Sequence, residues 1–335
     1  MTPARPDARE GIAHQGFEWP APVKLNLFLH VNGRRADGFH DLQTFFRLLD
    51  FGDSLFIQVR HDGVLQRLGD TVPGVTPEND LILRAADCLR RHVGRDDLGA
   101  DITLHKRAPV GGGLGGGSSD AATTLRALDR VWGLDLPQAT LEALGLSMGS
   151  DVPVFVRGLS GWAEGRGERL RPDDRPAGHY LVVRPDVSVR TAELFGAADL
   201  VRDTPRMALD PLPERLPTDN AFLPVLLKRS PAIRAVYDSL RSLGLHPRLT
   251  GTGACLFVPF PTRAAAVEAA AALPPGLAHF TATGRYRSAL LDALDAHADA
   301  HAHADAHADA HADAHADAHA DAHADAHARA GSTPS

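Results

Sequence analysis

The chain has 335 residues, and its two cysteines, Cys88 and Cys255, lie far apart in the sequence. This length suits about two domains of roughly 100–200 residues each, and two distant cysteines exclude a small disulfide-stapled scaffold. Since the chain shows no signal peptide and no long uncharged apolar run, we expect a cytoplasmic protein without a membrane span.

The formal net charge of -7 comes from the C-terminal end of the chain. Eight aspartates and one arginine follow residue 294, so the preceding residues carry 34 acidic and 34 basic side chains. A neutral body without a basic stripe gives no electrostatic footprint for nucleic acid. Nucleic acid is therefore not an expected partner, whereas a local pocket for a phosphorylated small molecule stays open.

Three compositional regions divide the chain. Residues 1–16 are polar and lack an apolar period, which predicts a disordered extension. Residues 17–293 alternate between strand-like and helix-like apolar patterns, which predicts a mixed α and β body. Residues 294–335 form a low-complexity tail of His, Ala and Asp without large apolar side chains, so it cannot join a core.

The first elements of the body are strands followed by a helix. Residues 23–31 alternate as a strand does, and residues 42–60 hold two apolar runs separated by the turn signal at residues 51–54. Residues 79–94 have a helical period, with Asn79 as the expected N-cap and Gly94 as the stop.

A glycine-rich loop then joins a strand to a helix. Residues 100–110 alternate, residues 111–117 read GGGLGGG, and residues 118–133 form a helical pattern that we expect to be capped by serine and closed by Gly133. Glycines let backbone N–H groups approach an anion, and the helix N-terminus adds unpaired donors and a positive dipole end. The arrangement predicts a phosphate-binding loop, with a mobile linker as the alternative.

General phosphate-loop patterns do not identify this loop. No lysine follows the glycines as the Walker pattern requires, and the G-x-G-x-x-G match of Gly111, Gly113 and Gly116 lacks the acidic residue expected on a second strand. The protein-kinase motifs H-R-D and D-F-G are also missing.

The second half contains two helices and a glycine turn. The helical pattern at residues 218–244 begins with the capping residues Asp219 and Asn220, is divided by Pro231 and ends at Gly244. Residues 248–258 then predict a glycine turn that feeds a strand, either as a plain hairpin turn or as a second approach to a ligand.

Four stretches together resemble a known family. The run PVGGGLGGGSSDAA at residues 109–122 resembles the phosphate loop of the GHMP kinases. The stretches at residues 21–46, 149–168 and 249–258 are similar, in order and spacing, to the branch that phosphorylates 4-diphosphocytidyl-2-C-methyl-D-erythritol in the non-mevalonate isoprenoid pathway. The likeness covers about residues 17–291.

The resemblance implies an α+β fold of two domains, residues 17–168 and 169–293, with the active site in the cleft between them. It implies ATP as phosphoryl donor, Mg²⁺ accompanying ATP, and transfer to the 2-hydroxyl of the CDP-linked alcohol. Lys24 and Asp151 would be the catalytic pair. The ATP phosphates would be wrapped by Pro109, Val110, Gly111, Gly112, Gly113, Leu114, Gly115, Gly116, Gly117, Ser118 and Ser119. The cytidine side would be lined by Asn26, Phe39, His40, Phe46 and Phe195, with Phe39 and Phe195 sandwiching the cytosine.

The chemistry of the pair can be weighed without the resemblance. Phosphoryl transfer asks mainly for positioning and charge stabilisation, so an ordinary carboxylate such as Asp151 can serve as base when a cation keeps it ionised. Lys24 is one of only three lysines in the chain, and a compact ammonium fits beside a carboxylate where an arginine fork would not. The alternatives are an N-cap role for Asp151 and a strand-edge charge for Lys24.

Other roles stay open from the residues alone. An isolated His40 is most often a surface or satisfied core residue, and Phe39 stands where related enzymes commonly carry tyrosine, so stacking survives without the phenol. Ser118 or Asp120 could reach the magnesium ion, but the sequence assigns no metal ligand, and it leaves the oligomeric state open. A binding module without catalysis and a GHMP kinase for another alcohol are the competing functions.

The tail allows two interpretations and one prediction. Its histidines recur every fourth residue from His303 to His327, which suits metal chelation along a helical stripe or a solvated repeat expansion. We expect truncation after Ala293 to leave kinase activity and melting temperature nearly unchanged, and to remove any zinc or nickel binding seen by calorimetry. Loss of activity in a folded truncated protein at matched magnesium would show that the tail is part of the enzyme.

Overall fold

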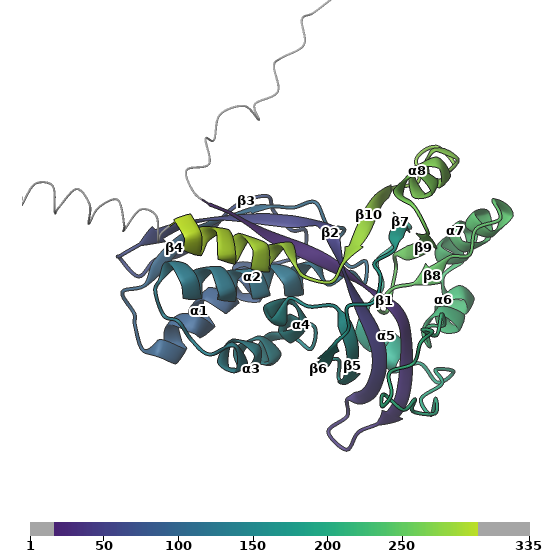
Figure 1. The fold of residues 1–335 in the computed structure, drawn as a ribbon, viewed down its shortest axis with the longest axis horizontal. Helices are drawn as coiled ribbons and strands as arrows, with labels where there is room; N and C mark the ends of the chain where they lie inside the picture. The colour runs from purple at the N-terminus through teal and green to yellow at the C-terminus, as the bar shows by residue number, and fades with distance from the viewer. Residues whose placement is uncertain (1–16, 301–335) are drawn as a thin grey trace, which may run out of the picture. The chain divides into compact units, whose positions relative to one another are not determined.

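The computed structural model describes residues 17–300 (Figure 1). The predicted N-terminal extension at residues 1–16 and the tail from residue 301 lie outside the described residues. Contacts divide the chain into two compact units, Met1–Leu291 and Asp292–Ser335, and the site lies in the first. The predicted boundary between residues 168 and 169 stays a prediction.

Two long antiparallel strands run through the first unit. β1 (Glu18–Arg34) pairs with β2 (His40–Arg60), and the register sets Lys24 opposite Leu48 and Asn26 opposite Phe46. From Ala21 to Val31 every residue of β1 is buried, because other elements cover both of its faces. The strand predicted at residues 23–31 is therefore confirmed, with longer ends.

The expected turn at residues 51–54 is wrong, because these residues lie inside the single strand β2. A Cβ atom on Gly52 would stand 2.2 Å from the carbonyl oxygen of Ala21, so glycine here serves a close approach between β1 and β2. The irregular register between Pro22 and Lys24 lies at the same place. Residues 51–54, which resemble a turn in sequence, thus lie at an irregularity within the strand pairing.

The sheet continues through both halves of the first unit. Its main path runs β3-β4-β2-β10-β7-β9-β8, while β1 and β5 also pair with β2, and β6 pairs with β5. Antiparallel pairing dominates, and only β3 and β4 run parallel. The remaining strands are β3 (Leu65–Gly69), β4 (Gly99–His105), β5 (Gly161–Gly165), β6 (Arg169–Pro172), β7 (His179–Val183), β8 (Arg248–Leu249), β9 (Leu256–Phe260) and β10 (His279–Arg285).

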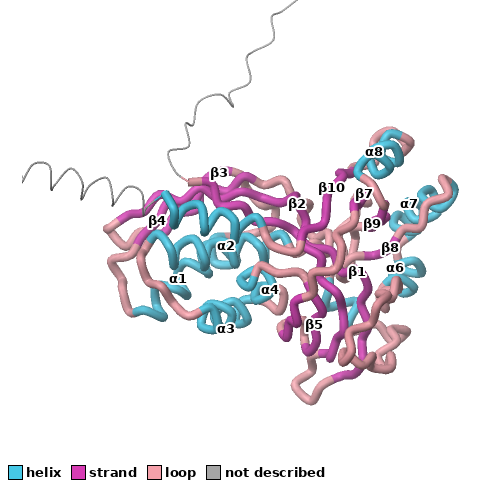
Figure 2. Tube along the Cα trace, in the orientation of Figure 1, coloured by secondary structure: helices cyan, strands magenta, loops and turns pink. Residues whose placement is uncertain are grey.

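Helices flank this sheet in two groups. Figure 2 shows α1 to α4 together beside the β2 and β4 part of the sheet, and α6 to α8 beside the β7 to β9 part. The helices are α1 (Leu81–Val93), α2 (Gly116–Val131), α3 (Gln138–Met148), α4 (Val152–Arg157), α5 (Thr191–Phe195), α6 (Leu223–Arg229), α7 (Pro231–Ser242) and α8 (Arg263–Ala271), with a 3-10 turn at Pro77–Asn79.

The ends of the helices were predicted correctly only in part. Gly94 ends α1 in a left-handed conformation, and Pro231 starts α7 after the break at Ser230, both as expected. The predicted N-caps are wrong. Asp80, not Asn79, caps α1 by accepting from the N–H of Ile82, because Asn79 belongs to the preceding 3-10 turn.

The other two expected caps lie inside or before their helices. α2 begins at Gly116 after left-handed Gly115, so the serines occupy its first turn instead of the cap position. α6 begins at Leu223, whereas the side chain of Asn220 accepts from the N–H of Phe222, in a turn just before the helix. α2 therefore begins after a glycine and α6 begins after a short turn, and neither helix has the polar N-cap residue that the sequence predicted.

Two hydrophobic clusters share the strand β1. One cluster joins Leu29 and Val31 of β1 to Leu181 of β7 and to Phe222, and another joins Val23 and the neighbouring apolar residues of β1 to Phe257 of β9. Burial of such side chains stabilises the fold by about 1.5–3 kcal/mol each. β1 is therefore the strand on which both parts of the core meet. In the described part of the chain, no helix is long and apolar enough to cross a membrane.

Candidate active site

Two cavities meet at the glycine-rich loop. The larger has a volume of about 930 Å³ and lies between β1, β2, α5 and the turn at residues 251–252. The smaller has a volume of about 360 Å³ and lies between α1 and the glycine-rich loop. Gly113, Gly115 and Ser118 line both cavities, so groups bound in the two cavities can meet at the start of α2.

The glycine-rich loop needs glycine at alternate positions. Gly111, Gly113 and Gly115 all have φ angles between 70° and 75°. A Cβ atom on Gly113 would stand 2.3 Å from the carbonyl oxygen of Thr250, so this position excludes every side chain. The loop can therefore lie against the turn at residues 250–254 only with glycine at residue 113.

The predicted ATP-binding residues lie together with one exception. Residues 109–118 all line the smaller cavity. Ser119 is fully buried instead and donates a hydrogen bond of 2.7 Å to the carbonyl oxygen of Pro22, which ties α2 to β1. Its place in the helix turns its hydroxyl toward the protein.

The predicted catalytic pair comes together across the larger cavity. The Nζ atom of Lys24 lies 3.3 Å from Oδ2 of Asp151, and the side chains are 3% and 34% exposed. Lys24 points from β1, and Asp151 precedes the first residue of α4. Asp151 thus occupies the N-cap position, but its side chain makes no capping hydrogen bond and faces Lys24.

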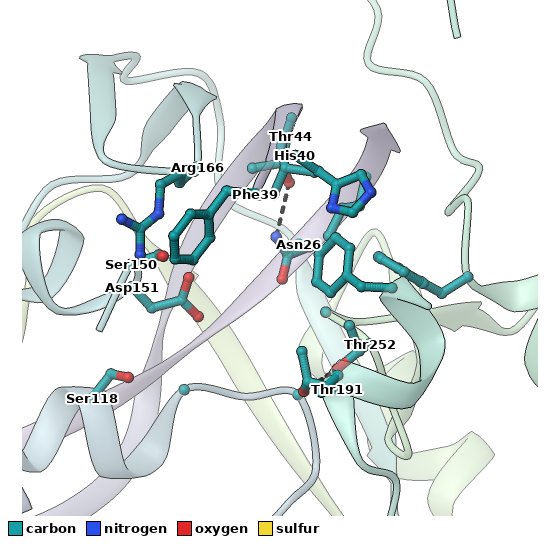
Figure 3. A pocket seen from close by; sticks show the side chains of 18 of the residues that line it. Asn26, Phe39, His40, Thr44, Ser118, Ser150, Asp151, Arg166, Thr191 and Thr252 are labelled. Carbon is teal, nitrogen blue, oxygen red and sulfur yellow. Dashed lines mark hydrogen bonds between the residues drawn. The ribbon is translucent and has the colours of Figure 1, made fainter. Parts of the chain in front are cut away.

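Asn26 and Phe46 lie at the Lys24 end of the same cavity. Oδ1 of Asn26 accepts a hydrogen bond of 2.5 Å from Lys24, and the Phe46 ring lies with its centroid 5.2 Å from Nζ. Figure 3 shows Asn26 on β1 with its amide directed at Thr44 and toward the side of Asp151. Both residues line the cavity as predicted, but next to the catalytic pair.

The predicted cytidine-binding aromatics form two separate contacts in the larger cavity. His40 and Phe195 stack with ring centroids 4.9 Å apart and an interplanar angle of 26°. Phe39 is 47% exposed, and the guanidinium of Arg166 lies 3.7 Å from its ring centroid. Figure 3 shows Phe39, His40 and Arg166 at the cavity, whose lining also includes Phe195. Sequence reasoning missed Arg166, which lies in the EGRGE run and places its guanidinium over that ring.

The surroundings of His40 favour its neutral form. Burial lowers the pKa of His40, and the positive charges of Arg202 and Arg34 lower it further. Nε2 of His40 is buried without a hydrogen-bond partner. A neutral ring with one unpaired nitrogen can donate to or accept from a ligand, depending on its tautomer.

A half-buried lysine and two buried carboxylates lie beside the glycine-rich loop, and Lys106 and Asp120 line the smaller cavity with it. Nζ of Lys106 lies 2.5 Å from Asp53 and 3.1 Å from Asp120. Oδ1 of Asp53 accepts from the N–H groups of Arg107 and Ala108, at 2.6 Å and 2.7 Å. The sequence indicated no role for Lys106, and the rarity of lysine in the chain was the one available signal.

Burial sets the charge state of this cluster. Burial raises the pKa of Asp120 to about 8, and the neighbouring Asp53 carboxylate acts in the same direction against the lowering effect of Lys106. Burial lowers the pKa of Lys106, but the two carboxylates outweigh it and raise that pKa overall. Near neutral pH the cluster therefore carries a positive Lys106 and a proton on Asp120, which limits negative charge in the lining of the smaller cavity.

Known families and proteins match this chain along most of its length. The GHMP kinases N terminal domain matches residues 80–159, and the GHMP kinases C terminal domain matches residues 209–276. A 4-diphosphocytidyl-2-C-methyl-D-erythritol kinase from Xanthomonas campestris pv. campestris (strain B100) is 52% identical over 278 residues, which cover 83% of this chain and 94% of that protein. The enzyme of the same description from Xylella fastidiosa (strain 9a5c) is 49% identical, covering 82% and 92%.

Solved structures show the same fold. A crystal structure of 4-(cytidine 5'-diphospho)-2C-methyl-D-erythritol kinase superposes with a TM-score of 0.68 at 30% identity, covering 80% of this chain and 98% of that chain. The mevalonate kinase of Methanococcus jannaschii superposes with a TM-score of 0.57 at 15% identity, covering 83% and 99%. The second likeness concerns the fold alone.

The raised pKa of Asp120 leads to a prediction about stability. Between about pH 4 and pH 8 the unfolded chain has lost the Asp120 proton while the folded chain keeps it, so rising pH destabilises the folded state across this window. We expect Asp120→Asn, which has no proton to lose, to remove this contribution, which amounts to at most about 1.4 kcal/mol per pH unit. Urea unfolding of both proteins from pH 5 to pH 9 measures the difference. Parallel stability curves for the two proteins would contradict the assignment.

Proposed function

This chain belongs to the GHMP kinase family, in the branch of the 4-diphosphocytidyl-2-C-methyl-D-erythritol kinases, and we propose that it transfers the terminal phosphoryl group of ATP to the 2-hydroxyl of 4-diphosphocytidyl-2-C-methyl-D-erythritol. It is a small-molecule kinase of isoprenoid precursor synthesis. The contact that supports the activity best is the Lys24–Asp151 ion pair at the junction of the two cavities.

ATP is proposed to bind in the smaller cavity. The side chains of Leu81, Leu104 and Val72 offer an apolar wall for the adenine, and the loop at residues 109–118 offers glycine N–H groups for the phosphates. The N-terminus of α2 adds its dipole. The terminal phosphate would then lie near Gly113 and Ser118, which line both cavities.

The CDP-linked alcohol is proposed to bind in the larger cavity. Its volume of about 930 Å³ lies within the usual range for ligand pockets of about 300–1,000 Å³. The cytosine can stack on the rings of Phe195, His40 and Phe39. The diphosphate would lie between the cytosine and Asp151, where Arg166 and Arg34 provide positive charge. The methylerythritol would then reach the Lys24–Asp151 pair.

The proposed chemistry follows from the properties of the pair. The hydroxyl oxygen attacks the terminal phosphorus, the bond from that phosphorus to the bridging oxygen of ADP breaks, and the hydroxyl proton passes to Asp151. Because the transition state is loose, the proton leaves late and a carboxylate suffices as base. The Lys24 ammonium orients Asp151, and it offsets negative charge on the transferring group.

Mg²⁺ is proposed to accompany ATP. The described residues contain no cluster of three His, Cys, Asp or Glu side chains that would hold a metal ion. This fits magnesium, which is usually held by phosphates, waters and one or two protein oxygens. The Ser118 hydroxyl at the junction of the cavities is the residue best placed to contact its water shell, and the bound ion would neutralise phosphate charge. A cytoplasmic location is also proposed, since nothing in the sequence marks a secreted or disulfide-linked protein.

The substrate is the first expected outcome. In a coupled assay of ADP release with ATP and magnesium, we expect turnover with the CDP-linked methylerythritol and none of comparable rate with homoserine or mevalonate. Faster turnover of either of those alcohols would leave only the membership of the GHMP kinases. No turnover with any alcohol, together with normal ATP binding, would favour a binding module.

The base is the second expected outcome. Asp151→Asn should lower kcat by about 100-fold or more while the KM for ATP changes little, because the loss falls on the transition state. Asp219→Asn changes an exposed carboxylate outside the lining of both cavities and is the matched control. Wild-type turnover in Asp151→Asn would mean that another group accepts the proton.

A further inference from the structure

The Lys24 ammonium makes two hydrogen bonds within the protein and one ion pair. Its partners are Oδ2 of Asp151 at 3.3 Å, Oδ1 of Asn26 at 2.5 Å and the carbonyl oxygen of Gly113 at 3.1 Å. An ammonium group has three hydrogens and no acceptor, so Asn26 and Gly113 use two of them and one is left for the side of Asp151. The direction in which Lys24 faces Asp151 is therefore set by Asn26 and Gly113.

The hydroxyl of Thr44 fixes the side chain of Asn26. Its single hydrogen is donated to the carbonyl oxygen of Phe28, so toward Asn26 the hydroxyl can only accept. Nδ2 of Asn26 donates to it at 2.9 Å, which leaves Oδ1 for Lys24. The ammonium requires the same orientation, since it can only donate. Both neighbours thus select one of the two possible amide orientations.

The hydroxyl of Thr250 holds the backbone of Gly113 and the backbone of Asn26. It donates to the carbonyl oxygen of Gly113 at 3.2 Å and accepts from the N–H of Asn26 at 3.0 Å. Thr250 is fully buried, and Thr44 and Asn26 are 1% and 2% exposed, so water does not replace these bonds readily. One hydroxyl therefore joins β1, the glycine-rich loop and the turn after β8.

We propose that Thr44 and Thr250 are positioning residues, which hold the Lys24 ammonium on Asp151 through Asn26 and Gly113. The inference deepens the proposed function and rests on it. Neither threonine needs to touch the reacting atoms. Thr44 acts only through the side chain of Asn26, whereas Thr250 also contacts the glycine-rich loop. Replacing the two threonines should therefore affect the KM for ATP differently.

Replacement by valine removes each hydroxyl and keeps the branched shape. Thr44→Val leaves Asn26 without an acceptor for Nδ2, and we expect kcat to fall about 10-fold to 100-fold, the size expected for a lost hydrogen bond to a charged group. The KM for ATP should stay within about twofold. Thr250→Val should lower kcat similarly and also raise the KM for ATP, because Gly113 loses a donor.

Two kinds of control separate positioning from general damage. Thr44→Ser and Thr250→Ser keep the hydroxyl and should restore most of the turnover. Thr123→Val removes a buried hydroxyl that donates to the carbonyl oxygen of Pro20, outside the lining of both cavities, and should leave turnover unchanged. Thermal melts of every variant report folding, and kinetics are compared only among folded variants.

A double variant tests the route through Asn26. If Thr44 acts by orienting this amide, Thr44→Val should cost little further activity in an Asn26→Ala background. A full additional loss would show that Thr44 acts by another route. Equal turnover of the valine and serine variants would overturn the proposal directly.

A measurement without substrate keeps this inference separate from the proposed function. The chain has three lysines, so protein with ¹⁵N-labelled lysine side chains gives at most three Nζ signals by NMR, and Lys24→Arg identifies one of them. We expect the Lys24 signal to be protected from water exchange in the wild type and in Thr44→Ser, and to be lost in Thr44→Val. Protection in all three would overturn the positioning role, whatever alcohol the enzyme phosphorylates. If instead the protection pattern holds while the CDP-linked alcohol is not turned over, the proposed function alone fails.

Discussion

The ion pair between Lys24 and Asp151 is the interaction on which the site depends, because its two members come from separate elements that must meet within one cavity. A nearly fully buried ammonium is unfavourable unless its charge and its hydrogens are matched. Here β1 supplies the cation, the start of α4 supplies the carboxylate, and the glycine-rich loop supplies a carbonyl oxygen. The Lys24–Asp151 contact thus joins β1 to the start of α4 and restricts how far these two segments can separate.

Lys106 repeats this solution on the other side of the glycine-rich loop. Its side chain is half-buried and paired, and Asp53 extends the cluster to the backbone N–H groups that lead into the loop. Two of the three lysines in the chain therefore lie on opposite sides of one loop. The glycine-rich loop is thus flanked by two cations whose charges are already compensated by protein groups.

Much of the fold and of the site could be predicted from the sequence, for physical reasons that also explain the gaps. Short-range patterns located β1, α1 and α7, and the motif resemblance brought Lys24 and Asp151 together in advance. The sequence around Gly52 wrongly predicted a turn, because the strand that packs against Gly52 cannot be identified from the neighbouring residues. Thr44 and Thr250 went unnoticed since a threonine in a strand or turn is ordinary, and only the three-dimensional bond pattern separates them from their neighbours.

The continuity of the sheet has a consequence for how the enzyme can move. β10 pairs with β2 on one side and with β7 on the other, so the strands of both helix groups form one hydrogen-bonded surface. Swinging one half about a hinge would break those backbone bonds, which makes domain closure of the kind common in kinases an expensive motion here. Adaptation to a ligand is therefore expected at the rim, in the tip between β1 and β2 that carries Phe39 and in the segment after β7 that carries Phe195.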